Sequence, residues 1–116
     1  MIDDTTYMLS IVDAIQQIES YTQEGKGAFL SNRMAQDAVL RNLEIIGEAT
    51  KHLSEGIREA YSHVPWRRIA GLRNVLSHDY LGVDLEEVWG VIEKHLPELK
   101  RHVETICSDL GILPES

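Results

Sequence analysis

Apolar residues recur at intervals of three and four along most of the chain, which is the period of an amphipathic helix. Residues 5–22 place four of them on one helical face: Met8, Ile11, Ile15 and Ile18. Residues 32–53 repeat the pattern over a longer stretch, with Ala35, Ala38, Val39, Ile45, Ile46, Ala49 and Leu53. Two glycines in TQEGKGAFLS predict a loop between these helices. Ser31 is the expected N-cap of the second helix.

The second half of the chain continues in the same way. SEGIREAYSHV is typical of a short helix and turn, and Pro65 suits the first turn of a helix over residues 66–77. Asp84 and Glu87 resemble a capping box. The last helix has a nearly heptad seam of Leu85, Val88, Trp89, Ile92, Leu96, Leu99, Val103, Ile106 and Leu110. Pro97 should kink or split it. We expect an all-α, antiparallel bundle of four or five helices, forming a single domain over residues 1–116.

Three features of the helical faces allow more than one interpretation. Gly47, in the middle of the long helix, indicates the close approach of another backbone, with a tolerated defect as the alternative. Glu44 and Glu48 lie four residues apart and are interpreted as an exposed or salt-bridging face rather than a catalytic pair. Cys107 lies in an apolar stripe and is expected to fill the core rather than act as a nucleophile.

Charge changes the picture because it is unevenly distributed. The chain carries a formal net charge of −8, which argues against non-specific binding of long polyanions over the whole surface. Between Glu59 and Asp79, however, there is no acidic residue, and this window holds Arg67, Arg68 and Arg73. A local basic patch on an acidic body is therefore expected. No apolar run approaches the length of a membrane span, and a lone cysteine is simplest in a reducing cytoplasm.

Polar and ionisable residues concentrate in the run GLRNVLSHDYLG, residues 71–82. On an α-helix, Arg67, Gly71, Asn74 and His78 would form one stripe, with Arg73 beside it. Gly71 would let a second helix or a ligand approach the backbone. Arg73 and His78 are five residues apart, or about 140° around the axis, so one copy makes a loose site. Two copies in a symmetric dimer would surround one groove with two arginines and two histidines.

The residue types in this run suit phosphate chemistry. Asn74 can orient His78, a histidine can accept or donate a proton near neutral pH, and a guanidinium can hold a phosphate with two hydrogen bonds. These are the minimum parts for RNA cleavage by the ribose 2′-hydroxyl, without a metal. The alternative is a helix end at which cations complement the helix dipole. The spacing by itself leaves both interpretations open.

Other histidines do not suggest a metal site. The four remaining ones lack ligand spacing and are expected to be solvated or structural, namely His52, His63, His95 and His102. The last two lie seven residues apart and could share one helical face. No phosphate-binding loop, dinucleotide fingerprint or nucleophile elbow is present in the sequence.

The octet RNVLSHDY resembles the R-x4-H-x-Y signature of HEPN domains of the HepT type. The resemblance extends to RNLEIIGEATKHLS and to VPWRRIAGLRNVLSHDYLGVDLEEVW, and covers roughly residues 38–100. It implies an all-helical, HEPN-like homodimer that acts as the toxin of a type VII-like toxin–antitoxin pair. The implied activity is metal-independent endoribonuclease cleavage of RNA, with no cofactor.

The resemblance also implies roles for individual residues. Arg73 and His78 would be the catalytic pair, with Asn74 in support. Tyr80 would be the hydroxyl to which an MntA-type nucleotidyltransferase antitoxin adds AMP groups, whose charge and bulk would block RNA. Arg67 and Arg68, in the acid-free window, are candidates for contact with RNA phosphates.

Two alternatives accompany this interpretation. Some HEPN domains are non-catalytic modules that bind a nucleotide or dock a nucleotidyltransferase, and the net charge of −8 favours such a module. Asp79, between His78 and Tyr80, could stabilise the charged form of His78 or, if it points inward, repel the substrate.

Overall fold

The computed structural model describes residues 3–75 and 83–112, and all regular structure within these ranges is helical. The elements follow in this order: α1 (Asp4–Tyr21), α2 (Lys26–Leu30), α3 (Arg33–Lys51), α4 (Glu55–Ala60), α5 (Trp66–Ala70), the 3₁₀-helix η1 (Gly71–Val75), α6 (Leu85–Gly90), the π-helical segment η2 (Val91–His95) and α7 (Leu96–Leu110). No helix in the described ranges combines the length and the apolarity needed to cross a bilayer.

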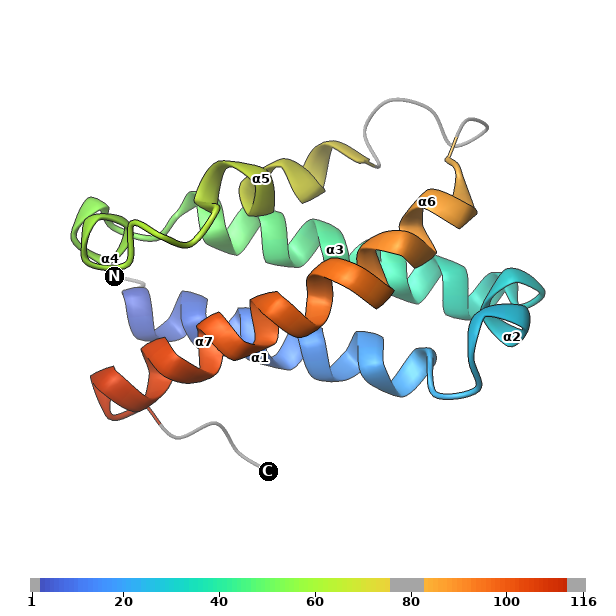
Figure 1. Cartoon of the computed structure of the whole chain (residues 1–116), viewed down its shortest axis with the longest axis horizontal. Helices are drawn as coiled ribbons and strands as arrows, with labels where there is room; N and C mark the ends of the chain where they lie inside the picture. Colours follow the sequence, from blue (N-terminus) through green and yellow to red (C-terminus); the bar gives the residue numbers. More distant parts are fainter. Residues whose placement is uncertain (1–2, 76–82, 113–116) are drawn as a thin grey trace.

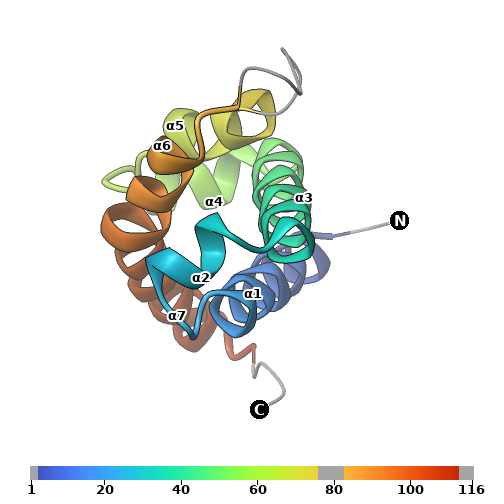
Figure 2. The same cartoon turned by 90° about the vertical axis from the view of Figure 1, so that its right-hand side faces the viewer.

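Four helical rods run alternately in opposite directions along the bundle (Figure 1). They are α1, α3, α5 with η1, and α6 continuing into α7. The end-on view places these rods around a common centre, with α2 across the near end (Figure 2), and α4 lies at the opposite end of the bundle (Figure 1). The expected all-α antiparallel bundle is confirmed.

The apolar faces predicted from the sequence meet in one core. The four α1 residues Met8, Ile11, Ile15 and Ile18 are at most 2% exposed. The core cluster also takes in Val39, Leu43 and Ile46 of α3 and Leu96, Leu99, Val103 and Ile106 of α7. Burial of one such side chain contributes roughly 1.5–3 kcal/mol, whereas an exposed ion pair contributes about 1 kcal/mol at most. The apolar core therefore holds the rods together.

The prediction of a loop between the first two long helices was wrong in part. It contains α2, whose Phe29 is buried and packs beside Trp89 with ring centroids 5.6 Å apart. Gly25 precedes α2 with φ +93°, a backbone conformation that suits glycine. The N-cap of α3 is Asn32 rather than Ser31: the Asn32 side chain accepts a hydrogen bond from the Ala35 amide at 3.1 Å. Ser31 instead ends α2 and donates its hydroxyl to helix carbonyls.

The predicted start and break of the last helix are confirmed, whereas Leu110, predicted to lie in its apolar seam, is 45% exposed. Asp84 is the N-cap of α6 and accepts hydrogen bonds from the Glu86 and Glu87 amides. Before Pro97 the helix widens into η2, and α7 then begins with the proline in its first turn. Proline lacks an amide hydrogen and cannot continue a regular α-helical ladder, so the break falls where the sequence predicts it.

The predicted α-helix over residues 66–77 is correct only for its first part. After Ala70 the chain tightens into η1, and residues 76–82 lie outside the described residues. A 3₁₀-helix has about three residues per turn instead of 3.6, so each residue turns by about 120°. Positions on η1 therefore differ in direction from those expected of an α-helix, and this segment carries the candidate site.

Candidate functional site

The backbone of η1 at Arg73 lies directly against α3 at Gly47. A Cβ atom on Gly47 would stand 2.5 Å from the Arg73 amide nitrogen and 2.9 Å from the Ala70 carbonyl oxygen. Any side chain at this position would push η1 away from α3. The expectation that Gly47 marks a close backbone approach is confirmed, and the approaching backbone is that of the candidate catalytic arginine.

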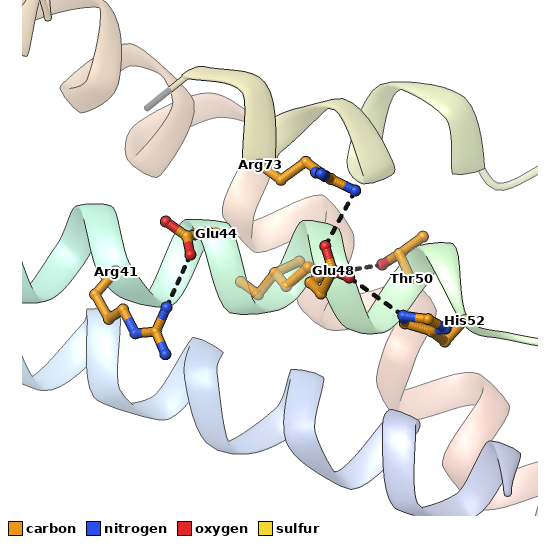
Figure 3. Close-up of polar contacts among 7 residues, drawn as sticks. Arg41, Glu44, Glu48, Thr50, His52 and Arg73 are labelled. Atoms are coloured by element: carbon orange, nitrogen blue, oxygen red, sulfur yellow. Dashed lines mark hydrogen bonds and ion pairs between the residues drawn. The ribbon is translucent and has the colours of Figure 1, made fainter. Parts of the chain in front are cut away.

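The side chain of Arg73 reaches the residue next to Gly47 (Figure 3). Its Nη1 lies 3.1 Å from Oε2 of Glu48, and the two side chains are 39% and 49% exposed. The other carboxylate oxygen of Glu48 lies 3.2 Å from Nε2 of His52. An ion pair this exposed contributes about 0.2–1 kcal/mol to stability. Its main consequence is therefore the direction in which the guanidinium points.

Asn74 follows Arg73 on η1 and is exposed. Because three residues make one turn of a 3₁₀-helix, Asn74 lies above Gly71, and Arg73 lies about 120° away from both. The predicted stripe of Gly71 and Asn74 thus persists, although it rests on a tighter helix than expected. Apart from its own helical segment, a Cβ on Gly71 would meet no atom of the described chain within 4 Å. The approach that the sequence suggested at Gly71 is therefore not made by the described part of the same chain.

His78, Asp79 and Tyr80 lie outside the described residues. Of the three predicted catalytic residues, the structure places Arg73 and Asn74 on consecutive positions of η1, beside α3. The catalytic role assigned to Arg73, Asn74 and His78 stays a prediction, as does the modification of Tyr80.

Arg67 and Arg68 are exposed on α5, immediately before η1. Arg68 borders a pocket of about 200 Å³ between α5–η1 and the final rod. The pocket is lined by Pro65, Arg68, Ile69, Leu72, Val91, His95, Leu96, Glu98, Leu99 and His102. Arg73 and Asn74 are not among its lining residues. The contact of Arg67 and Arg68 with RNA stays a prediction.

The other histidines occupy surface and packing positions. His95 and His102 line the same pocket, which confirms that they share a face. His102 packs edge-on against His63, with ring centroids 5.4 Å apart, and its Nε2 lies 3.6 Å from the Glu98 carboxylate. His52 stacks on Tyr7. Within residues 3–75 and 83–112, no group of three or more His, Cys, Asp or Glu side chains is arranged to hold a metal ion.

Cys107 is 2% exposed and belongs to the core. Burial raises the pKa of its thiol, because the thiolate would lose its hydration. A buried thiol with a raised pKa is a poor nucleophile, so its expected role as core filler is confirmed.

The two glutamates on α3 both form ion pairs, as the sequence suggested. Glu44 pairs with Arg41, 2.8 Å away on the same helix, whereas Glu48 pairs across elements with Arg73. Sequence reasoning treated the two glutamates alike and missed the connection of Glu48 to the site. The available signal was its place between Gly47 and His52, which lies one helical turn further along.

Comparison with known proteins identifies the fold and the family. A solved structure of a tri-AMPylated Shewanella oneidensis HEPN toxin in complex with an MNT antitoxin superposes with a TM-score of 0.65, covering 93% of this chain and 99% of that one. At 21% identity this likeness shows a shared HEPN fold.

Sequence relatives are closer. The "Probable ribonuclease HepT" of Thermococcus cleftensis is 38% identical over 101 residues, which is 86% of this chain and 92% of the relative. The "Gamma-glutamylcyclotransferase and putative RNase" of Methanocaldococcus jannaschii is 40% identical over 109 residues, and this chain spans about half of its length (49%). The family model described as "Ribonuclease HepT-like" matches residues 11–106. The chain therefore belongs to the HepT-like ribonuclease family.

Proposed function

We propose that this protein is the toxin of a HEPN/MNT toxin–antitoxin pair and acts as a metal-independent endoribonuclease. The observation that carries the proposal is the family match over residues 11–106, which includes the complete R-x4-H-x-Y signature at Arg73, His78 and Tyr80. The anchoring of Arg73 against α3 supports it, because a phosphate-binding guanidinium needs a fixed origin.

The proposed reaction uses the RNA itself as the nucleophile. His78 removes the proton from a ribose 2′-hydroxyl, whose oxygen attacks the adjacent phosphorus. Arg73 stabilises the added negative charge of the crowded phosphorane. The bond from phosphorus to the 5′-oxygen breaks, and that oxygen takes up a proton. The products are a 2′,3′-cyclic phosphate and a free 5′-hydroxyl.

The proposed unit is a homodimer. One chain supplies a single signature histidine, His78, whereas the reaction needs one group to accept a proton and another to donate one. A second subunit placed along the Gly71–Asn74 face would provide both. The open space at Gly71 is compatible with such close packing.

The proposed control is the covalent addition of AMP. An MntA-type nucleotidyltransferase would transfer AMP from ATP to the Tyr80 hydroxyl, releasing pyrophosphate. Each added phosphate would place a negative charge beside the arginines and repel RNA. The solved complex of a tri-AMPylated HEPN toxin with an MNT antitoxin supports a partner of this class.

The test uses partner-free, unmodified protein, whose intact mass shows no added adenylate. It should cut RNA in the presence of EDTA and leave 2′,3′-cyclic phosphate ends, and RNA with 2′-deoxyribose should stay intact. Arg73→Ala and His78→Ala should each lose at least about a hundredfold in cleavage rate. If His78→Ala cuts as fast as the wild type, the proposed activity is wrong.

A non-catalytic module that docks a nucleotidyltransferase is the second candidate, favoured by the net charge of −8. In that case Arg73→Ala and His78→Ala would leave the growth effect of the protein unchanged in cells. Tyr80→Phe would abolish modification in both cases, so the arginine and histidine variants distinguish the two functions.

A further inference from the structure

We propose that Glu48 is a positioning residue of the catalytic site. Its carboxylate holds the Arg73 guanidinium in the direction needed to meet the RNA phosphate. The inference rests on the proposed function and adds to it a residue outside the R-x4-H-x-Y signature. It follows from how α3 engages Arg73 at two consecutive positions.

Gly47 and Glu48 act on different parts of the same arginine. Gly47 admits the Arg73 backbone, since a Cβ there would stand 2.5 Å from its amide nitrogen. Glu48 then receives the side chain, with Nη1 of Arg73 3.1 Å from its Oε2. The backbone and the guanidinium of Arg73 are thus both held by the same turn of α3. A long side chain that is fixed only at its backbone would retain most of its rotamers.

Glu48 is itself oriented by a second contact. Its Oε1 lies 3.2 Å from Nε2 of His52, one helical turn further along α3. The His52 ring stacks on Tyr7 of α1, with ring centroids 5.3 Å apart and an angle of 15° between the planes. Both carboxylate oxygens therefore have a nitrogen partner (Figure 3), and the contacts continue from α1 through α3 to η1. Supporting contacts of this kind hold a catalytic side chain in one geometry.

An anion beside a phosphate-binding arginine has two opposite effects. Arginine has five N–H donors in a fixed fork, so a carboxylate at Nη1 leaves donors available for phosphate oxygens. The same carboxylate repels the phosphate through its charge. Positioning by Glu48 therefore predicts a specific kinetic pattern: removing its charge lowers kcat through misorientation, while KM for RNA stays constant or falls.

The experiment compares Glu48→Gln with a matched control, Glu44→Gln. Both variants remove one carboxylate from the exposed side of α3, one turn apart, but Glu44 pairs with Arg41 of its own helix. Cleavage by Glu48→Gln should show kcat at least about tenfold lower than wild type, since small displacements of a catalytic group have large effects on rate. Glu44→Gln should stay within about twofold. His52→Phe, which keeps a ring for Tyr7, should give an intermediate kcat.

A second readout does not depend on cleavage. In ¹⁵N NMR, the Arg73 Nε–Hε group, assigned by its loss in Arg73→Lys, should be rigid in the wild type and in Glu44→Gln and more mobile in Glu48→Gln. If RNA is cut and Glu48→Gln keeps kcat within twofold of Glu44→Gln, the inference is overturned while the proposed function stands. If neither the wild type nor any variant cuts RNA, the proposed function fails. In that case the NMR comparison by itself tests the role of Glu48. Equal mobility of the Arg73 Nε–Hε group in the wild type, Glu44→Gln and Glu48→Gln would overturn the positioning role.

Discussion

The amide nitrogen of Arg73 packs against Gly47 of α3, so closely that a Cβ on Gly47 would stand 2.5 Å from it. In a helix interior, Gly→Ala is ordinarily stabilising by about 1 kcal/mol. At this position the added carbon would meet backbone atoms, which cannot rotate away. The sign of the effect should therefore reverse.

We expect Gly47→Ala to lower the free energy of unfolding by about 1–3 kcal/mol, the usual cost of overpacking. It should also reduce RNA cleavage per folded molecule, because η1 would move relative to Glu48. Urea denaturation measures the first effect and initial cleavage rates the second. Gly90→Ala is the control, since a Cβ at Gly90 would meet nothing within 4 Å of the described chain. Equal stability of the two variants would contradict the close packing at Gly47.

Gly71 provides a test of the dimer. Its φ is −67° and a Cβ there would meet nothing within 4 Å of the described chain, so alanine fits the isolated subunit without strain. If a second subunit packs on this face, Gly71→Ala and the larger Gly71→Leu should weaken self-association in that order. Helix content by circular dichroism should not change. Sedimentation velocity over a range of concentrations measures the association, and identical dimer affinities in all three proteins would remove Gly71 from the interface.

Arg67 and Arg68 should contribute to RNA binding through charge alone. Each phosphate contact on a single strand contributes about 0.7 to the slope of log K against log salt concentration. Arg67→Gln with Arg68→Gln should therefore reduce the slope by about 1.4 if both contact phosphate. Binding is measured with a non-cleavable 2′-O-methyl RNA at several salt concentrations.

Arg33→Gln serves as the control for these arginines, because Arg33 begins α3 and lies beside Asp37 rather than on α5. Its slope should match that of the wild type. A double variant with an unchanged slope would exclude Arg67 and Arg68 from the RNA interface.

The Cys107 thiol should resist alkylation in the native protein. Burial raises its pKa, so at pH 7–8 its thiolate fraction is smaller than that of a free cysteine, and reagent cannot reach it. Iodoacetamide labelling followed by intact mass should show no adduct in buffer and one adduct in denaturant. Burial of Cys107 also makes stability depend on pH. The thiol ionises more easily in the unfolded state, so the free energy of unfolding falls as pH rises above the ordinary pKa of a thiol. Rapid labelling in buffer would contradict the buried position.

Much of the fold follows from local pattern. The spacing of Met8, Ile11, Ile15 and Ile18 predicts the buried face of α1, and Pro97 predicts the break before α7. Both are decided by the repeat of the helix and by the covalent structure of proline, which do not depend on distant residues. The shift of the α3 cap from Ser31 to Asn32 and the appearance of α2 were missed, because the burial of Phe29 depends on Trp89, which lies 60 residues further along the chain.

The sequence by itself determined the helical periods, the basic window and the signature that makes Arg73, His78 and Tyr80 the candidate site residues. The tertiary structure alone decided that the chain tightens into η1 beyond Ala70, that Gly47 receives the Arg73 backbone, and that Glu48 rather than Glu44 meets its side chain. The physical reason is that the spacing of apolar residues describes each helix separately and not how two helices pack together. Which turn of α3 lies against η1 depends on how the two rods pack, and packing is a property of the assembled core.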